Sequence, residues 1–534
     1  MAKNILIKKF ISKFHFFVPI LLFFMLMSIG FVRLDPDFGY RLKNGELIFR
    51  EGFAFFKMTD PYSYTMPSYK FIEHAWGVAL FIYLIYSRIG LIWLSFLWSV
   101  FVFLSLFFST KTSRTDFYKK IPFGIFSNYL CVFILTSFSY FFAIRAQVIS
   151  WLFLSFFLYL YFNERLWRKV RYLIPVFFLF WVNLHGSFLV GLATFSFLIF
   201  MDFTQEINLR SLWKFKDFKA QLADKRFKFY KEMLLLLLLS FLVTLVNPYG
   251  LNIWRQVTAE VSMGELRWKV LEWIPIIFSF KTVYGLYLAI SLVFVIKQKE
   301  KVGKTRFYLY FSYLVMGLLV IRHFPLYLLV SLPITIDAIG YFFEEIKKTK
   351  GASKRAMAVF RSLSIFSFLL FFLIYFINIG NGFGLSEKSS YPMNAVGYIK
   401  QNIPEGEIFS LYGWGGYLNW KLPEKRVFVS GFMPVWDRKD APENESTNAF
   451  KEYVGMVDGS VDYKSIFEKY DIDTVLLPIQ KDSQSAKSVL MKFKIIYHYL
   501  FDRNERKSFY EILGDDGWKI KYNDDSSVIF ERPQ

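Results

Sequence analysis

The sequence predicts an α-helical polytopic membrane protein with a C-terminal extracytoplasmic α/β domain. Three observations support this prediction. Of the 534 residues 55% are hydrophobic and 67 are Phe, and the mean hydropathy is +0.34, more apolar surface than a soluble core can hide, so the surplus must face lipid. Long apolar runs recur through residues 1–380, and residues 381–534 lack them.

We predict about eleven membrane-spanning helices, because a span needs ~20 apolar residues and fewer where flanking charged side chains reach the membrane surface. The first run follows four lysines, is too long for the apolar part of a signal peptide and is followed by no small-residue cleavage pattern, so we expect a retained anchor. The predicted spans are 14–33, 91–109, 121–143, 146–162, 172–186, 187–203, 233–248, 279–296, 307–322, 325–343 and 360–379.

The net charge of +21 indicates topology rather than nucleic-acid binding. One alternating set of loops contains 30 Lys and Arg and 9 Asp and Glu, and the rest of the chain contains 34 of each kind. Because positive loops stay on the cytoplasmic side, we place this set, with the N-terminus, in the cytoplasm and expect no nucleic-acid partner. The loops are 1–13, 110–120, 162–171, 204–232, 297–306 and 344–355.

The first outer loop, 34–90, is predicted to contain interfacial helices. Residues 75–88 are apolar but short for a span, and if they crossed, the basic loop 110–120 would lie outside, so we expect an interfacial or re-entrant helix. Residues 38–50 are predicted to form an amphipathic helix. Its apolar face is Phe38, Leu42, Gly45 and Phe49, and its basic face is Arg41, Lys43 and Arg50.

The remaining chain divides into a second outer loop, 249–278, and an outer α/β domain, 381–534. In the latter, helical stretches at 392–401, 446–455 and 462–470 alternate with short apolar runs, which is typical of an α/β sheet. These runs are Ile408–Leu411, Arg426–Val429 and Thr474–Leu477. The single cysteine, Cys131, excludes a disulfide framework within the chain and a cysteine-based zinc cluster.

With this topology, the polar residues near the membrane gather at the outer ends of the spans. Taken singly, they have structural explanations: arginines at helix ends can anchor to headgroups, and Asn or His can join helices. Taken together, they fit a phosphorylated membrane substrate, because arginine binds phosphate with two hydrogen bonds and a carboxylate can act as general base. The candidates are Asp35, Asp37, Glu73, His74, Arg145, Asn183, His185, Glu272, Arg322 and His323.

Several motifs, in order along the chain, resemble a group of bacterial polytopic membrane proteins of the GT-C superfamily, the polyprenyl-phosphate-sugar-dependent glycosyltransferases. The motifs are LDPDFGYRLKNGELI, DPYSYT, HAW, RAQ, NLHG, NPYG, EW and YGWGGYLNWKLPEKRVFVSG. The chain departs from that group at Arg41, where a His is usual, and at Ser430, Gly431 and Phe432, where DGR is usual.

The resemblance implies an inverting glycosyltransferase in the bacterial plasma (inner) membrane, with its C-terminal domain periplasmic or extracellular. On this basis Asp37 or Asp35 is the catalytic carboxylate, and Arg145 and Arg322 contact the phosphate of an undecaprenyl-phosphate sugar donor. The partners would then be membrane lipid, this donor and an unidentified acceptor at the outer face.

Two other functions stay open, a lipid-linked glycan transporter or flippase and a non-catalytic cell-envelope assembly factor. A transporter calls for ionisable residues along a route through the bilayer, whereas only Asp202 and Asp337 are acidic residues placed within spans. Asp35 and Asp37 could bind a divalent cation through their carboxylate oxygens. No further pattern in the sequence supports such a site, so we expect no cofactor.

Overall fold

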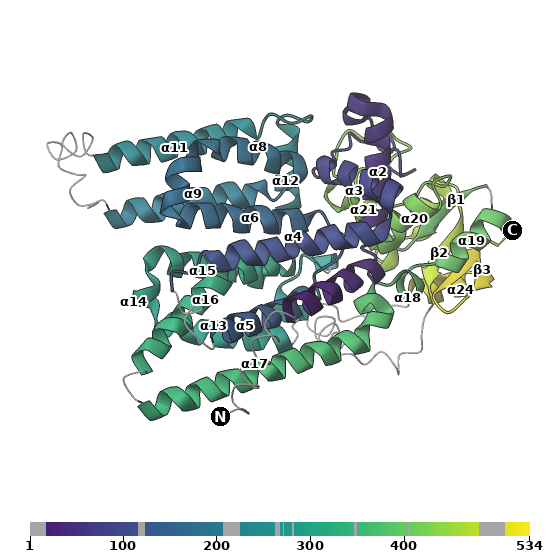
Figure 1. Cartoon of the computed structure of the whole chain (residues 1–534). Helices are drawn as coiled ribbons and strands as arrows, with labels where there is room; N and C mark the ends of the chain where they lie inside the picture. The colour runs from purple at the N-terminus through teal and green to yellow at the C-terminus, as the bar shows by residue number, and fades with distance from the viewer. Residues whose placement is uncertain are drawn as a thin grey trace.

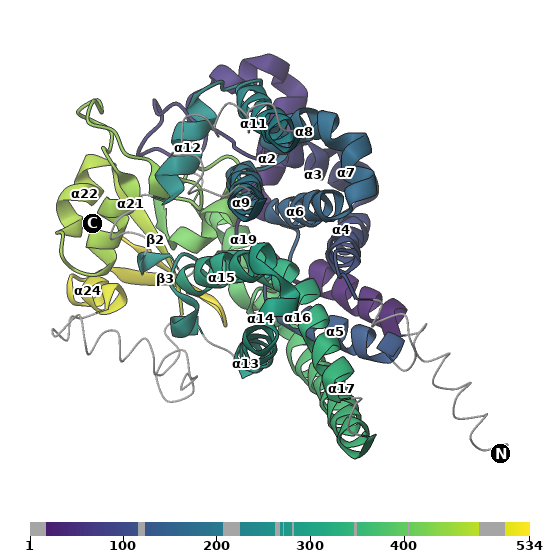
Figure 2. The same ribbon diagram turned by 90° about the vertical axis from the view of Figure 1, so that its left-hand side faces the viewer.

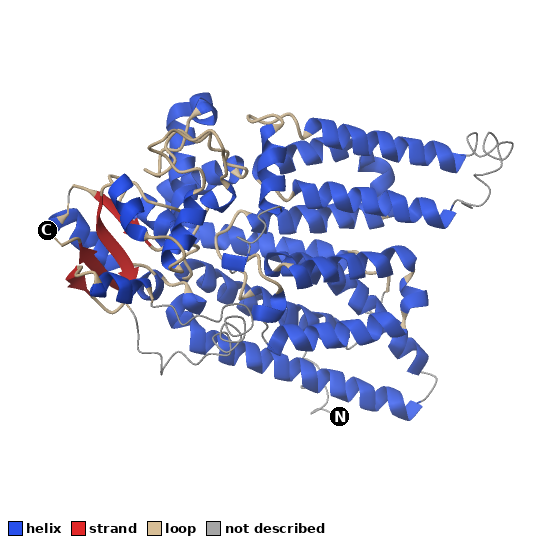
Figure 3. Ribbon diagram, turned by 180° about the vertical axis from the view of Figure 1, so that it is seen from behind, coloured by secondary structure: helices blue, strands red, loops and turns tan. Residues whose placement is uncertain are grey.

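The protein is a long helical bundle with a small mixed sheet at one end, as the computed structural model shows (Figure 1, Figure 3). The structure describes residues 18–115, 123–206, 225–261, 268–270, 272–279, 282–346, 350–403, 405–479 and 508–533. The basic segment 1–13, the start of the first predicted span and parts of several other predicted loops lie outside these ranges.

Each of the eleven predicted spans contains a helix, as the apolar runs indicate. Among the described residues, four helical segments are long and apolar enough to cross a membrane, so the chain is a multi-pass membrane protein. They are Leu91–Lys111, Phe188–Gln205, Ile321–Ile346 and Ile365–Gly384. The number of helices that cross stays a prediction. The helices are Val18–Val32, α4 Leu91–Lys111, α5 Phe123–Phe138, α6 Gln147–Phe162, α8 Ile174–Leu184, α9 Phe188–Glu206, α11 Lys225–Val243, α13 Thr282–Lys297, α15 Lys304–Leu319, α16 Phe324–Ile346 and α17 Lys350–Asn378.

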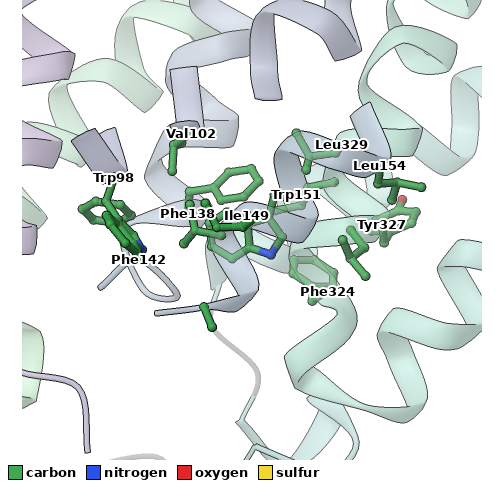
Figure 4. Packing of buried hydrophobic residues seen from close by; sticks show 14 of the residues in the cluster. Trp98, Val102, Phe138, Phe142, Ile149, Trp151, Leu154, Phe324, Tyr327 and Leu329 are labelled. Carbon is green, nitrogen blue, oxygen red and sulfur yellow. The ribbon is translucent and has the colours of Figure 1, made fainter. Parts of the chain in front are cut away.

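Helix α16 forms the centre of the bundle, and its side chains from Phe324 to Gly340 are buried. It contacts α4, α6, α13 and α15, and Figure 4 shows Phe324, Tyr327 and Leu329 of α16 in one packed cluster with residues such as Trp98 of α4 and Trp151 of α6. By contrast, leucines of α11 and α17 are exposed. In a membrane these outward side chains face lipid, and the helices associate through the packing of such buried contacts.

The two acidic residues within the spans are both engaged by neighbouring side chains. The Asp337 carboxylate accepts hydrogen bonds from Ser113 Oγ at 2.6 Å and from Arg306 Nη1 at 2.7 Å. The Asp202 carboxylate accepts one from Tyr161 Oη at 2.7 Å. These bonds join helices, which is a structural role.

Asp337→Asn is therefore expected to destabilise the bundle. The substitution leaves the buried Arg306 guanidinium without its charge partner, a loss of about 3–5 kcal/mol. Thermal unfolding of the full-length protein in detergent would show a lower midpoint, and Asp525→Asn on the exposed surface would leave it unchanged. Equal midpoints for the two variants would contradict the structural role of Asp337.

Short helices lie at both ends of the bundle. At the end that carries the sheet lie α2 Phe38–Glu51, the 3-10 helix η1 Gly52–Lys57, α3 Trp76–Ile89 and α12 Asn252–Val261, and at the opposite end lies α14 Lys299–Val302, within a predicted basic loop (Figure 1). The remaining short elements between the spans are α7 Glu164–Val170, η3 Arg171–Leu173, η6 Ile276–Ser279 and η7 Ile321–His323. The helix predicted at 75–88 is confirmed as α3.

Helix α2 differs from the prediction in how its faces are used. Arg41, placed on the polar face, is buried, and Phe49, placed on the apolar face, is 56% exposed. The reason is close packing on both sides: a Cβ at Gly39 would lie 2.0 Å from the Gly416 carbonyl oxygen, and one at Gly45 would lie 2.2 Å from that of Ala79. Helices α3 and α20 (Gly415–Lys421) thus enclose α2, and the placement of Arg41 on an outward polar face was wrong.

In its described residues, the C-terminal tail forms a four-stranded mixed sheet in the order β1-β2-β4-β3. Strands β1 and β2 are parallel, and β4 is antiparallel to both β2 and β3. The predicted helical stretches are confirmed as α19, α21 and α22. The tail elements are η8 Ile379–Gly384, α18 Glu387–Ser390, α19 Met393–Asn402, β1 Glu407–Ser410, η9 Tyr412–Trp414, α20 Gly415–Lys421, η10 Met433–Val435, α21 Ala449–Val457, α22 Tyr463–Lys469, β2 Ile472–Pro478, α24 Phe509–Asp515, β3 Lys519–Asn523 and β4 Ser527–Glu531.

The apolar run Arg426–Val429 does not form a strand, so this part of the prediction was wrong. Val427 makes single bridges to Ser63 and Ile408, and its N–H donates to the Tyr62 carbonyl at 2.9 Å. The Phe428 carbonyl accepts a hydrogen bond from Thr65 Oγ1 at 2.7 Å. The segment attaches the tail to the first outer loop. Figure 2, which looks along the bundle, shows strands β2 and β3 to one side of the helices.

Candidate active site

Two adjoining cavities lie at the end of the bundle next to the tail. The large cavity has a volume of about 60 Å³ and the small cavity a volume of about 10 Å³. The small cavity therefore has space for one water molecule or one oxygen atom of a ligand. Asp37, Arg41 and Arg322 line both cavities. The small cavity is also lined by Arg145, Ala146, Gln147 and His185. The large cavity is also lined by Tyr40, Phe71, Ile72, Glu73, His74, Gln256, Glu260, Val270, Trp273, Tyr412, Gly431, Phe432, Pro434 and Val435.

The two aspartates after the first helix have different surroundings. Pro36 separates them, and α2 begins directly after Asp37. The Asp35 carboxylate is buried, accepts the Asp37 N–H at 3.0 Å and pairs with Arg145 Nε at 2.6 Å. The Asp37 side chain is 27% exposed, and its nearest cation is Arg41 at 4.0 Å. Asp37 therefore presents a carboxylate to both cavities, whereas Asp35 is enclosed.

Burial raises the pKa of Asp35 to about 6, against the opposing effect of Arg145. The negative charges of Asp37 and Glu272 raise it further. Asp35 is enclosed and pairs with an arginine, so it helps to hold the geometry of the site. It cannot reach a substrate to exchange a proton.

Arg145 is held between two carboxylates. Besides Asp35, its guanidinium contacts Glu272 of the second outer loop, and the Trp98 indole N–H donates to its carbonyl at 2.8 Å. Burial by itself raises the pKa of Glu272, but Arg145 and Arg322 lower it below its usual value. Because protein carboxylates already compensate Arg145, its charge is not free for a ligand.

Arg322 is the arginine whose charge the site leaves available. Its Nε donates to Gln147 Oε1 at 3.1 Å, and its guanidinium lies 5.5 Å from the centre of the Trp273 ring. Within the described ranges, no carboxylate lies at ion-pair distance from it. Its backbone N–H donates to the Glu272 carbonyl at 3.2 Å, which fixes its place beside both cavities.

Glu73 joins α2 to the start of α3. Its carboxylate pairs with Arg41 at 2.8 Å and accepts hydrogen bonds from Asn44 Nδ2 at 2.6 Å and from the Ala75 N–H at 2.9 Å. Burial by itself raises the pKa of Glu73, but Arg41, His74 and these hydrogen bonds together lower it. Glu73 thus stays ionised and fixes Arg41 at the cavity wall.

His185 presents one N–H group to the small cavity. Its Nδ1 accepts the Ser187 N–H at 3.1 Å and lies 2.9 Å from Ser150 Oγ, so the proton of the neutral ring is assigned to Nε2. That atom is buried and has no hydrogen-bond partner in the described part of the chain. Because Nδ1 accepts a hydrogen bond, the ring presents its Nε2–H to the small cavity as a donor.

The other sequence candidates occupy different places. His74 lines the large cavity, with Nδ1 3.4 Å from Glu260. Asn183 lines neither cavity: its amide donates to the Leu179 and Val246 carbonyls at 2.9 and 3.1 Å and accepts from the Trp76 indole at 3.1 Å. His323 and Glu272 also line neither cavity. The structure therefore brings Asp37, Arg145, Arg322, His185, His74 and Glu73 together at the cavities, and gives Asn183 a structural position.

Several residues at the site were not among the candidates. Arg41 was treated as part of a polar helix face, and Gln147 carried no separate role although it belongs to the RAQ motif. The tail residues Tyr412, Gly431 and Phe432 lie more than 370 positions from Asp37, so no local pattern could have linked them. In the described ranges, no group of three or more His, Cys, Asp or Glu residues is arranged to hold a metal ion.

Comparisons with known proteins identify similar solved structures. The chain is similar to the crystal structure of ArnT from Cupriavidus metallidurans bound to undecaprenyl phosphate, with a TM-score of 0.47 and 11% identity, and the match covers 100% of both chains. No protein-family model and no curated protein matches the sequence.

Proposed function

We propose that the protein is an integral membrane glycosyltransferase that moves a sugar from a polyprenyl-phosphate-linked donor to an acceptor hydroxyl at the outer face of the membrane. The observation that carries this proposal is the position of Asp37, an accessible carboxylate between a small cavity rich in hydrogen-bond donors and a larger open cavity. Such a position suits a general base between two substrates.

The small cavity fits one oxygen of the donor phosphate. Arg322, Arg41 and the His185 Nε2–H face it as donors, and a phosphate oxygen is the acceptor that arginine and imidazole N–H groups bind best. The same donors stabilise the negative charge that develops on the phosphate as it leaves. We assign Arg145 a supporting role, since Asp35 and Glu272 compensate its charge.

The reaction proceeds by displacement at the anomeric carbon. The acceptor oxygen forms a bond to this carbon while the bond to the phosphate oxygen breaks, and the electron pair leaves with the phosphate. Asp37 takes the proton of the acceptor hydroxyl. Because the acceptor enters from the large cavity and the phosphate occupies the small one, attack comes from the face opposite the leaving group, and the configuration inverts.

The placement in the membrane completes the proposal. The bundle, residues 1–380, holds the donor site; the outer loops 34–90 and 249–278 and the domain 381–534 lie on the outer side of a bacterial plasma membrane, with the N-terminus in the cytoplasm. The positive charge of the loops at the opposite end supports this orientation. The hydrogen-bonded state of Asp202 and Asp337 argues against a route for ions through the bundle.

Arg322→Gln is expected to weaken the binding of a prenyl phosphate by about tenfold or more, because a hydrogen bond to a charged group contributes about 1.5–3 kcal/mol. The measurement is the affinity of the full-length protein in detergent for farnesyl phosphate, with farnesol as the uncharged comparison. Arg255→Gln, an exposed arginine of α12 outside both cavities, is the matched control. Equal affinity for farnesol and farnesyl phosphate in the wild type would contradict the proposed donor site.

A further inference from the structure

The large cavity is built from two distant parts of the chain. Asp37 and Tyr40 of the first outer loop form one side, and the tail forms the other with Tyr412, Gly431 and Phe432. The Tyr412 hydroxyl donates to the Gly431 carbonyl at 3.4 Å, and the Phe432 ring packs edge-on against Tyr40 with centroids 4.9 Å apart. The tail is therefore a wall of the cavity that contains the accessible carboxylate.

We propose that the large cavity is the acceptor site and that it takes a neutral carbohydrate. Its tail wall consists of Tyr412, Gly431, Phe432, Pro434 and Val435. The chemistry at Asp37 rests on the proposed function, and the class of acceptor rests on the lining of the cavity.

The charges around the large cavity disfavour an ionic acceptor. Glu73 pairs with Arg41 at 2.8 Å, and Glu260 lies 3.4 Å from His74, so two of the carboxylates already have basic partners. An anionic acceptor would meet three carboxylates, including Asp37. A cationic acceptor would meet Arg41 and Arg322, which line the same cavity.

The remaining groups suit a polyhydroxylated ring. Gln256 and Glu260 of α12 supply an amide and a carboxylate that hydroxyl groups can bond. Trp273 and Phe432 supply aromatic surface, on which the apolar C–H face of a sugar ring packs. The lining thus combines aromatic surface with hydrogen-bonding side chains, and the hydroxyl that reaches Asp37 is the one that reacts.

Gly431 keeps the Asp37 carboxylate open to this cavity. A Cβ at position 431 would lie 2.7 Å from Asp37 Oδ1, whereas the next contact, Tyr40 Cε1, would be 3.7 Å away. The clash falls on the end of a side chain that can rotate, so an added methyl group displaces the carboxylate rather than the backbone. Gly431 is thus a positioning residue for Asp37.

The first test is the chemical accessibility of Asp37 in the full-length protein. A water-soluble carbodiimide with glycine ethyl ester, followed by mass spectrometry of the modified peptides, should label Asp37 and leave the buried Asp35 unlabelled. Gly431→Ala should reduce Asp37 labelling to the level of Asp35 and lower sugar transfer by about 10²-fold. Gly397→Ala, where a Cβ meets open space in α19, should match the wild type. Wild-type labelling in Gly431→Ala would overturn the role of the tail.

The second test concerns the class of acceptor. Methyl glycosides of the common hexoses at high concentration should protect Asp37 from labelling, whereas choline should not. Protection by choline, or no protection by any glycoside, would overturn the carbohydrate assignment. Farnesyl phosphate affinity in the same preparation separates the two proposals: if farnesyl phosphate binds and no glycoside protects, the acceptor class alone is wrong, and if farnesyl phosphate does not bind, the proposed function fails.

Discussion

Asp37→Asn is expected to lower the kcat of sugar transfer by about 10²–10⁴-fold, the usual contribution of a general base. Asparagine keeps the shape of the side chain but cannot accept the proton of the acceptor hydroxyl. The measurement is transfer of a radiolabelled sugar from polyprenyl-phosphate-linked donors in membranes that contain equal amounts of each variant.

Two comparisons make this result specific. Farnesyl phosphate affinity and the thermal unfolding midpoint should not fall in Asp37→Asn, since Asp37 is partly exposed and makes no close ion pair. Asp35→Asn should lower both transfer and stability, because Asp35 pairs with the buried Arg145 at 2.6 Å. Wild-type transfer in Asp37→Asn would exclude Asp37 as the base.

Arg145→Ala is expected to destabilise the folded protein by about 3–5 kcal/mol at pH 8, because it leaves the buried Asp35 carboxylate without a compensating charge. Glu272 loses its partner as well. The unfolding midpoint of the full-length protein in detergent, compared with the wild type at each pH, measures this effect.

The same variant should show a smaller defect at pH 5.5. The folded-state pKa of Asp35, about 6, lies above the ordinary value of about 3.9, so its proton binds more tightly in the folded state. The stabilisation from this proton is complete below about pH 4 and is lost as the pH rises through about 6. Without Arg145 the pKa of Asp35 rises further, so protonation relieves the defect at a higher pH.

The double variant Asp35→Asn with Arg145→Ala provides the control for this pH dependence. It lacks the titrating carboxylate, and its difference from the wild type should depend less on pH than that of Arg145→Ala. An equal midpoint difference at pH 8 and pH 5.5 in Arg145→Ala would contradict the assignment of the buried charge to Asp35.

Much of the fold could be predicted from the sequence because its signals are local. Apolar runs predicted eleven spans, and the structure has a helix in each of them. A run too short to span predicted the helix at 75–88, which is observed as α3. Alternating helical and apolar segments predicted the tail sheet, but Arg426–Val429 looks like a strand and is bound instead to the first outer loop. An apolar run indicates that a segment is buried. Which other segment packs against it depends on the tertiary structure.

The sequence alone was enough to establish a multi-pass helical protein and to indicate a set of polar residues at its outer helix ends. Both results rest on the composition and on the distribution of charge along the chain, which can be read without the fold. Only the tertiary structure distinguished Asp35 from Asp37, which are two positions apart and chemically identical. Arg145 encloses one, and Gly431 leaves room for the other. These differences arise from contacts between residues more than 100 positions apart, so burial and charge pairing, which decide the chemistry of a carboxylate, are properties of the folded chain.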